Sequence, residues 1–361
     1  MECNTVIEIN KREISLDNPV YFIADIASNH DGNLERACDL IRLAKKSGAD
    51  AVKFQHFQAS QIVSDFGFSH LKTKIGHQNG WKKSVFETYK DYECPKDWTD
   101  DLIGTARTVG IDFLTTPYDF EAVNFFKNYT PAFKVGSGDI TWIEFLEYIA
   151  QQGKPVFLAT GASSMEDVER AVAAILKYNR NLVLLQCNTN YTGRRENFRY
   201  VNLNVIQSYA KRFPGMVLGF SDHTPGETAV LGAVSLGARV IEKHFTDDNN
   251  RVGPDHLFSM NPKSWKEMVE NTRDLEVALG SGLKVIEKNE NETVIIQRRC
   301  IRAAHDLKPG LIINRADLDI LRPSPPGAAQ PYEIGSFIGK KIITAKQRGE
   351  DISISDVEFT S

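Results

Sequence analysis

The alternation of short strand-like segments with longer helical segments is the feature that most constrains the fold of this chain. Eight β-rich runs recur between residues 20 and 245, and apolar residues at helical spacing fill most of the intervals. The runs are VYFIADIA (20–27), AVKFQHF (51–57), DFLTTPY (112–118), AFKVGSG (132–138), PVFLATG (155–161), NLVLLQCN (181–188), MVLGFSDH (216–223) and RVIEKHF (239–245). Eight strands with a helix after each predict an α/β fold, a (β/α)8 TIM barrel. The alternative, a doubly wound sheet, is disfavoured because no GxGxxG segment follows the first strand.

The alternation of strand-like and helical segments ends near residue 285. The segments 298–323 and 340–359 share a spacing, since Gly310 precedes Asp317 by seven residues and Gly349 precedes Asp356 by seven. This internal repeat predicts a small β-rich module. We therefore expect a barrel domain over residues 1–284 and a β-rich domain over residues 285–361.

Charge and composition exclude several classes of protein. The net charge is -4, from 43 basic and 47 acidic residues, which gives no reason to expect nucleic acid or an anionic membrane as a partner. No apolar run approaches the ~20 residues that span a membrane. The N-terminus shows no apolar signal segment, and the five cysteines form no CxxC pair. These features predict a cytoplasmic enzyme.

One connection in the predicted barrel is unusually long. Residues 58–96 separate the second strand from its helix, and this stretch with its flank holds several aromatic residues, among them Phe57, Trp81 and Tyr89. A connection of this length in a compact domain is usually a lid or an oligomer contact.

Two histidines and two acids are expected to meet at one side of the barrel mouth. Functional residues of such barrels gather at the carboxyl ends of the strands, and alternate residues of a strand point inward. Ser221 and His223 then share one face, as do Glu242 and His244, while Lys243 points toward the helices. Barrel closure brings Asp25 of the first strand beside the eighth. The two imidazoles predict a divalent-cation site that Asp25, water or substrate completes.

The other side of the predicted mouth carries lysines and hydroxyls. Lys53 and Lys134 lie inside apolar strands, where an unpaired charge would be costly, so a bound anion would balance them. The neighbouring polar residues at the strand ends are Gln55, Thr116, Ser137, Thr160, Thr189 and Tyr191. Two lysines among hydroxyls form an environment suited to phosphate. The mouth is thus expected to join a phosphate side to a metal side.

The sequence resembles the sialic acid synthase family, which includes legionaminic and pseudaminic acid synthases. The resemblance rests on ADIASNHDG, ADAVKFQ, FLTTPYD, FKVGSGD, KPVFLATGASS, GFSDHTPG, GARVIEKHFT and GPDHLFSMNP, and then on RRCIRAAHDLKPG and LRP. It implies a synthase that condenses phosphoenolpyruvate with an N-acetylated hexosamine, or with a diacetamido sugar, and releases phosphate. It also implies that the C-terminal module is an antifreeze-like (SAF) domain.

The resemblance implies roles for particular residues. His223 and His244 would hold Mn²⁺, with Mg²⁺ or Co²⁺ as alternatives, and Asp25 would orient the attacking water. The phosphoenolpyruvate contacts would be Lys53, Lys134, Ser137, Thr160 and Ser221. The position of Thr116 and Thr189 at the ends of predicted strands adds these two residues to that set. The sugar contacts would be Gln55, Tyr191, Glu242 and Asp255. Family members are domain-swapped homodimers in which a SAF arginine, here Arg322, reaches the partner's site.

The chain departs from the family pattern at several points. Asp25 replaces a glutamate, Ala162 replaces a methionine, and Ser324-Pro325-Pro326 stands where a Gly-x-Gly is usual. We expect the backbone at Asp25 to lie closer to the site, because aspartate is one methylene shorter. Two alternatives stay open: a synthase for a phosphorylated sugar, with Arg194 and Arg195 as extra cations, and a catalytically silent carbohydrate-binding protein.

Overall fold

The computed structural model describes residues 2–71, 78 and 81–358, and the chain divides into two compact units. The first unit is Met1–Gly280 and the second is Ser281–Ser361, so the division falls four residues before the boundary expected from the sequence.

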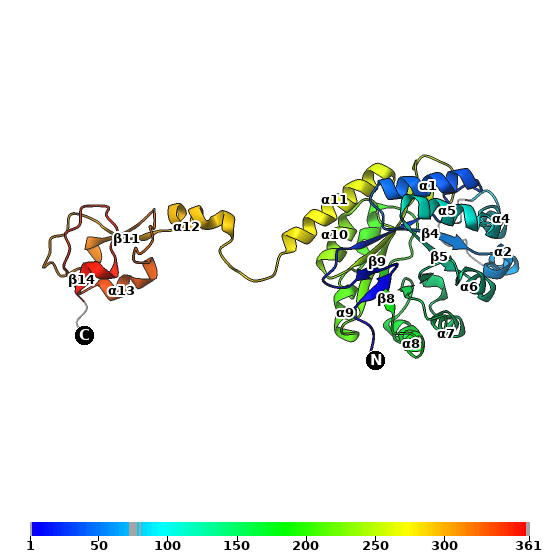
Figure 1. Ribbon diagram of the computed structural model, residues 1–361, viewed down its shortest axis with the longest axis horizontal. Coiled ribbons are helices and arrows are strands. Elements are labelled where there is room, and N and C mark those ends of the chain that lie inside the picture. Colours follow the sequence, from blue (N-terminus) through cyan, green and yellow to red (C-terminus); the bar gives the residue numbers. More distant parts are fainter. Residues whose placement is uncertain (1, 72–77, 79–80, 359–361) are drawn as a thin grey trace. The chain divides into compact units, whose positions relative to one another are not determined.

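Eight parallel strands close into a barrel in the first unit, which confirms the predicted TIM-barrel fold (Figure 1). The strands are β3 (Tyr21–Asp25), β4 (Ala51–His56), β5 (Asp112–Pro117), β6 (Phe133–Val135), β7 (Val156–Ala159), β8 (Leu182–Cys187), β9 (Val217–Asp222) and β10 (Val240–His244). They follow one another around the barrel in chain order, and β10 pairs with β3 to close it. All eight coincide with the runs predicted from the sequence.

Helices cover the outside of the barrel (Figure 1). They are α1 (Leu34–Lys46), α5 (Thr99–Val109), α6 (Phe120–Phe126), α7 (Ile143–Ala150), α8 (Met165–Leu176), α9 (Val205–Arg212), α10 (Thr228–Ser235) and α11 (Pro262–Leu279). Side-chain oxygens of Asn33, Asp119 and Ser164 accept hydrogen bonds from the first turns of α1, α6 and α8, which fixes where these helices begin. Gly110, with φ +69°, reverses the chain between α5 and β5 in the left-handed conformation that glycine favours.

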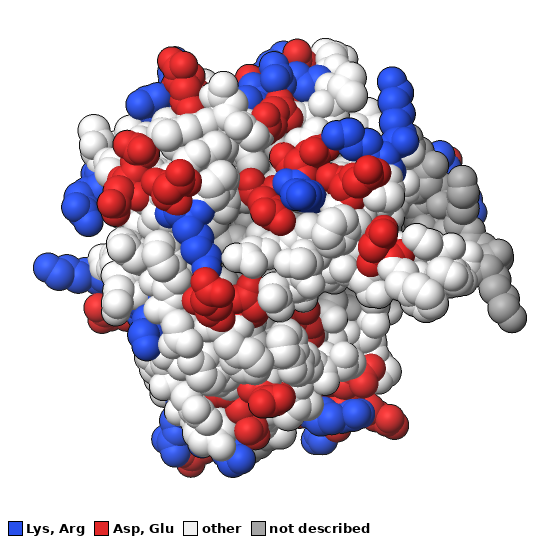
Figure 2. All heavy atoms as spheres, turned by 90° about the vertical axis from the view of Figure 1, so that its right-hand side faces the viewer, with Lys and Arg blue, Asp and Glu red and all other residues white. Residues whose placement is uncertain are grey.

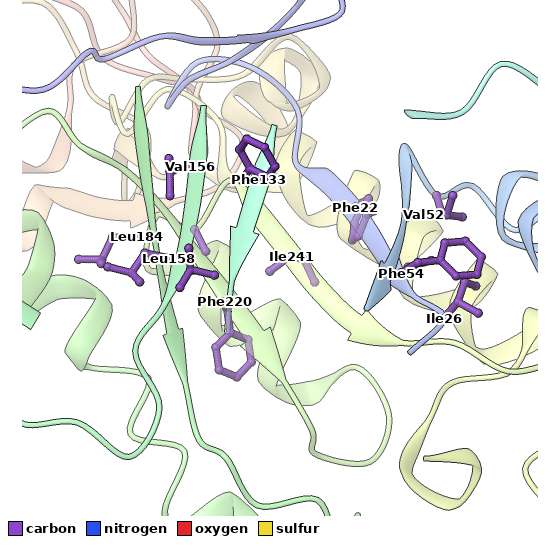
Figure 3. Close-up of a cluster of buried hydrophobic side chains, with 14 of the residues drawn as sticks. Phe22, Ile26, Val52, Phe54, Phe133, Val156, Leu158, Leu184, Phe220 and Ile241 are labelled. Atoms are coloured by element: carbon purple, nitrogen blue, oxygen red, sulfur yellow. The ribbon is translucent and has the colours of Figure 1, made fainter. Parts of the chain in front are cut away.

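Alternate residues of each strand divide the core of the barrel unit into two layers. Side chains such as Phe22, Phe54 and Phe220 point outward and pack under the helices (Figure 3). Side chains such as Tyr21, Ile23 and Phe157 point inward and fill the barrel interior. Burial of each of these side chains stabilises the fold by about 1.5–3 kcal/mol.

An N-terminal hairpin, absent from the sequence prediction, closes the interior layer. Strands β1 (Ile7–Ile9) and β2 (Arg12–Ile14) pair in antiparallel register, and the isoleucines of both belong to the interior cluster. The hairpin was missed because strands of three residues are too short to give a periodic signal.

The long connection between β4 and α5 contains short helices. These are α2 (Ala59–Ile62), α3 (Asp65–Ser69), α4 (Val85–Asp91) and the 3₁₀ turn η2 (Lys96–Trp98). Ser84 and Glu87 form a capping box that starts α4, since each side chain bonds to the other residue's backbone N–H. Residues 72–77 and 79–80 of this connection lie outside the described residues.

The second unit is built from two similar halves. β11 (Cys300–Ala303) pairs with β12 (Leu318–Leu321), and β13 (Lys341–Ile342) pairs with β14 (Val357–Glu358). A 3₁₀ turn precedes β12 and another precedes β14, and Asn314 and Ser353 cap these turns in the same way. Gly310 and Gly349 take matching φ angles of 96° and 86°. Two short helices, α12 (Asn291–Gln297) and α13 (Ile334–Phe337), complete the unit.

The helices and the surface agree with the sequence on two points, the absence of a membrane-spanning segment in the described residues and the balance of charges. Within the described residues, no helix has the length and apolar character needed to cross a membrane. On the face shown in Figure 2, basic and acidic side chains are interspersed, in agreement with the small net charge of -4.

Candidate active site

A cavity of about 190 Å³ opens among the residues that follow the carboxyl ends of the barrel strands. Ten residues predicted from the sequence line it: Asp25, Gln55, Lys134, Ser137, Tyr191, Ser221, His223, Glu242, His244 and Asp255. The position agrees with the rule that barrel sites form at this end of the sheet.

The register of β10 with its neighbours places the acids and imidazoles together. His244 stands opposite Asp25 of β3, and Glu242 stands opposite Ser221 of β9. The Ser221 hydroxyl donates to Glu242 Oε1 at 3.2 Å. Lys243 points away from the cavity, as expected, and its Nζ lies 2.5 Å from Asp222 Oδ2.

Asp25 is almost completely buried, and its carboxylate is held from several sides. Oδ2 forms an ion pair with Lys53 Nζ at 2.9 Å and accepts a hydrogen bond from Gln55 Nε2 at 3.0 Å. Oδ1 accepts a hydrogen bond from the Ala27 N–H at 3.1 Å. The Tyr118 hydroxyl in turn donates to Gln55 Oε1 at 3.2 Å. Ala27 has φ +47°, so a left-handed residue turns the chain back over the carboxylate. An inward shift of the backbone relative to the family stays a prediction.

Each buried lysine already has a carboxylate partner, which corrects the argument that a bound anion must balance both. Lys53 pairs with Asp25 and also donates to Thr116 Oγ1 at 3.1 Å. Lys134 Nζ lies 3.2 Å from Glu242 Oε1. Burial alone would lower the pKa of Lys134, but the nearby Glu242 and Asp25 carboxylates outweigh burial and raise it. Lys134 is therefore a cation, and its ammonium has further N–H donors for a ligand.

The two imidazoles have the properties of a metal-binding pair. Their ring centroids are 5.4 Å apart. His223 Nδ1 donates to the Asn188 carbonyl at 2.9 Å. Burial alone would lower the pKa of His223, but the hydrogen bonds to Cys187 and to the Asn188 carbonyl outweigh burial and raise it. A cation would bind Nε2 in place of a proton on that nitrogen. Burial lowers the pKa of His244 to about 3, so this ring is neutral, the form that binds metals; its Nδ1 is buried and has no hydrogen-bond partner within the described residues.

The protein supplies few other ligands near this pair. Among residues 2–71, 78 and 81–358, no group of three or more His, Cys, Asp or Glu side chains is arranged to hold a metal ion. The pair fits a cation whose remaining positions are filled by oxygen atoms of solvent or substrate.

Five predicted site residues do not line the cavity. Lys53 and Thr116 are buried: Lys53 pairs with Asp25, and Thr116 accepts a hydrogen bond from Lys53. Thr189 packs so close to Gly161 that a Cβ on that glycine would lie 2.7 Å from Thr189 Cγ2. Arg322 is an exposed residue of the second unit, and its Nε donates to the Gln297 carbonyl at 2.5 Å.

Thr160 points to the outside of the barrel. Phe157 and Ala159 of β7 face the interior, so alternation turns Thr160 toward α9. There it accepts a hydrogen bond from the Tyr209 hydroxyl at 3.0 Å and donates to the Leu185 carbonyl at 3.0 Å. Its predicted contact with phosphoenolpyruvate stays a prediction.

Sequence reasoning missed most of the outer wall of the cavity. This wall, named here the aromatic wall, consists of Phe57, Trp81, Tyr89, Tyr92 and Tyr118. Three of its members, Trp81, Tyr89 and Tyr92, come from the long connection that the sequence marked as functional, and the length of that connection was the available signal. Tyr118 could have been found from its place directly after β5.

Cys187, the last residue of β8, also lines the cavity. It is hydrogen-bonded to His223. Burial alone would raise the pKa of Cys187, but the bond to His223 and the nearby Lys134 outweigh burial and lower it. The pairing could not be read from the sequence because His223 is 36 residues away and on the next strand.

Fold and cavity together define a (β/α)8 protein with a charged, imidazole-bearing cavity at the carboxyl ends of its strands, followed by a separate β-rich unit. Two family models match the chain in the same arrangement. The chain belongs to the NeuB family, whose model matches residues 40–284, and a SAF domain follows at residues 298–358. Both parts of the resemblance seen in the sequence are confirmed.

Characterised relatives are similar over most of the chain. The N,N'-diacetyllegionaminic acid synthase of Legionella pneumophila is 36% identical over 329 residues, 89% of this chain and 90% of the relative. The N-acetylneuraminate-9-phosphate synthase of Homo sapiens is 32% identical over 342 residues, 94% of this chain and 93% of the relative. The crystal structure of N-acetylneuraminic acid synthetase from Leptospira borgpetersenii, in complex with citrate, aligns with a TM-score of 0.70 at 29% identity, over 81% of this chain and 96% of that chain.

Proposed function

We propose that this protein condenses phosphoenolpyruvate with the open-chain aldehyde of an N-acetylated hexosamine or a diacetamido-trideoxyhexose to give a nonulosonic acid. The observation that carries the proposal is one cavity lined both by anion-binding groups, Lys134 with the Ser137 and Ser221 hydroxyls, and by the imidazoles of His223 and His244. The legionaminic and sialic acid synthases among the relatives support it. Since phosphoenolpyruvate is a cytoplasmic metabolite, we place the reaction in the cytoplasm.

The reaction consumes water and releases phosphate. C3 of phosphoenolpyruvate forms a bond to the aldehyde carbon, whose oxygen takes up a proton. Water adds to C2 and loses one proton, which leaves a hydroxyl at C2. The C2–O bond to phosphate then breaks, the phosphate leaves with that bond's electron pair, and the C2 hydroxyl gives up its proton to form the 2-keto acid. Lys134 with the Ser137 and Ser221 hydroxyls would bind the anionic enol phosphate. Asp25, fixed by Lys53, Gln55 and Ala27, would orient the water and accept its proton.

We propose His223 and His244 as the ligands of a divalent cation, Mn²⁺ first and Mg²⁺ or Co²⁺ as alternatives. A cation held there supplies Lewis-acid polarisation of the aldehyde oxygen. The orphaned Nδ1 of the buried His244 supports the assignment, because a neutral imidazole without a partner is costly to bury.

The aromatic wall supports an acceptor that carries apolar substituents. Acetamido methyl groups can pack on the rings of Trp81, Tyr89 and Tyr92, and Gln55 and Asp255 offer polar partners beside them. Arg194 and Arg195, the cations considered for a phosphorylated sugar, are exposed and do not line the cavity. We therefore propose an acceptor without phosphate.

The proposed function is tested by measuring phosphate release from phosphoenolpyruvate in the presence of Mn²⁺. The acceptors would be N-acetylmannosamine, a 2,4-diacetamido-trideoxyhexose and the 6-phosphate of N-acetylmannosamine. We expect release with an unphosphorylated sugar. Release with the 6-phosphate alone would support the phosphorylated-sugar synthase, and no release with any acceptor would support a silent binding protein.

We further propose that the active form is a domain-swapped homodimer in which Arg322 completes the partner's site. The second unit exposes large apolar side chains, including Leu283 (73% exposed), Tyr332 (85%) and Ile354 (68%). Arg322 is exposed as well, so its guanidinium is available to a partner.

Mixing two inactive variants tests this assembly. We expect Arg322→Ala and Glu242→Gln to be inactive separately and to recover activity when co-expressed, because one mixed dimer then contains one intact barrel facing one intact arginine. If the two variants pair at random, half of the dimers contain one chain of each kind. Each of these mixed dimers has one intact site out of two, so activity should reach roughly a quarter of that of the wild type. If Arg322 serves its own barrel, co-expression restores nothing.

A further inference from the structure

Two segments at the barrel mouth, residues 26–33 after β3 and 245–261 after β10, lie side by side because β3 and β10 are neighbours in the barrel. The second segment brings Pro254 and Asp255 to the cavity wall. It also carries Phe258, whose ring packs against His244 with centroids 4.9 Å apart and against Tyr191 at 5.6 Å. The position of this segment therefore shapes the acceptor side of the cavity.

The Asp31 carboxylate binds two side chains of the second segment, those of Arg251 and His256. Its Oδ2 accepts from Arg251 Nε at 2.9 Å and Nη2 at 2.7 Å, and its Oδ1 bonds to His256 Nε2 at 2.9 Å. His256 is fully buried, and its other ring nitrogen bonds to Thr246 Oγ1 at 2.7 Å. Charge-assisted hydrogen bonds of this kind are among the strong ones in proteins. Asp31 thus holds both flanks of the 253–255 turn.

Ser28 lies at the cavity wall and is hydrogen-bonded to Asp255, the cavity-lining acid of that turn. Its hydroxyl donates to Asp255 Oδ2 at 2.6 Å, and its backbone N–H donates to the same oxygen at 3.2 Å. A carboxylate accepts about four hydrogen bonds, so Asp255 keeps acceptor sites for a ligand. The next residue, Asn29, donates from Nδ2 to the Phe245 carbonyl and to Ser259 Oγ, each at 2.9 Å.

The turn between the two anchors is closely packed. A Cβ at Gly253 would lie 2.6 Å from His256 Cδ2, so only glycine fits between the Asp31–His256 contact and the cavity. Arg36 adds a bidentate bond to Asp247, with both N–O distances 2.6 Å. Segment 245–261 is therefore attached to the first βα segment at its start, centre and end.

We propose that Ser28 and Asp31 are positioning residues that set the acceptor specificity of the site: Ser28 orients the Asp255 carboxylate, and Asp31 holds the turn that carries it. The ligand class is a neutral polyhydroxylated sugar, recognised by the free acceptor sites of Asp255. Neither Ser28 nor Asp31 is hydrogen-bonded to Lys134, Ser137 or Ser221, the residues proposed to bind phosphoenolpyruvate; their side chains bond to Asp255, Arg251 and His256. The identity of the ligand of Asp255 rests on the proposed function.

Ser28→Ala and Ser28→Thr test the orientation of Asp255. Loss of one hydrogen bond to a charged group should raise the KM for the acceptor on the order of 10-fold, while the KM for phosphoenolpyruvate changes less than about twofold. Ser28→Thr restores the hydroxyl and should restore the acceptor KM. An equal rise in both KM values, or an unchanged acceptor KM in Ser28→Ala, overturns the proposal.

Asp31→Asn tests the anchor without any substrate. Hydrogen exchange should accelerate in residues 245–261 and stay unchanged in the barrel strands, and the acceptor KM should rise as for Ser28→Ala. Glu169→Gln, which removes an ion pair with Arg212 on the outer helices, is the matched control and should change neither readout. Faster exchange with an unchanged acceptor KM, or unchanged exchange, overturns the proposal. Absence of turnover by the wild type with every sugar instead contradicts the proposed function, and exchange still decides whether Asp31 anchors the segment.

Discussion

His244→Ala is expected to lower metal-dependent turnover by at least about 100-fold, comparable to the loss of a donor that stabilises developing charge. His244 is 6% exposed, faces the cavity and stands opposite Asp25 in the register of the barrel. The variant loses one of the two imidazoles proposed to hold the cation. His223→Ala should behave in the same way, and its effect should not add to that of His244→Ala, because either change removes the site.

Metal binding itself separates this explanation from damage to the fold. Wild-type protein treated with a chelator should lose activity and regain it with Mn²⁺, whereas His244→Ala should bind no stoichiometric Mn²⁺ by calorimetry. Circular dichroism should match the wild type, since the substitution removes a side chain at the mouth and not in the packed layers. His305→Ala, at an exposed position of the second unit, is the matched control. Full Mn²⁺ binding by His244→Ala would contradict the assignment.

The strands of the barrel and the inward-facing acids and imidazoles could be predicted because both follow from local periodicity. A strand alternates its side chains with a period of two, and the chain order of the strands repeats around the barrel. These two rules place His244 beside Asp25 and turn Lys243 outward. The same alternation, applied to β7, turns the Thr160 side chain outward, toward Tyr209. Thr160 was predicted to face the barrel mouth because it lies at the end of a strand.

Contacts across the barrel interior could not be predicted from the sequence. Lys134 on β6 and Glu242 on β10 are separated by three intervening strands in the sheet, yet their side chains meet over the core. The pairing depends on barrel diameter and tilt, which no local pattern encodes. The aromatic wall was missed for a related reason, since the connection that supplies Trp81 and Tyr89 has no regular period from which a facing direction follows.

Lys134→Met is expected both to abolish phosphoenolpyruvate binding and to destabilise the barrel. The side chain is buried, and Lys134 Nζ lies 3.2 Å from Glu242 Oε1, so the substitution leaves a buried carboxylate without its cation. Breaking a buried pair in this way typically costs about 3–5 kcal/mol of unfolding free energy. Urea titration followed by intrinsic fluorescence measures this loss, and calorimetric titration with phosphoenolpyruvate measures binding.

Two further variants separate the loss of stability from the loss of function. In Lys134→Met/Glu242→Gln the uncompensated charge is gone, so most of the unfolding free energy should return while phosphoenolpyruvate binding stays absent. Lys243→Met breaks the neighbouring buried pair with Asp222, on the side of β10 that faces the helices. It should be destabilised to a similar extent and keep the wild-type affinity for phosphoenolpyruvate in the folded fraction. Wild-type affinity in Lys134→Met would show that the anion binds elsewhere; weakened affinity in Lys243→Met would show that binding is lost through destabilisation of the barrel and not through loss of the Lys134 ammonium. The two lysines thus distinguish a cation that binds the substrate from one that only stabilises the barrel.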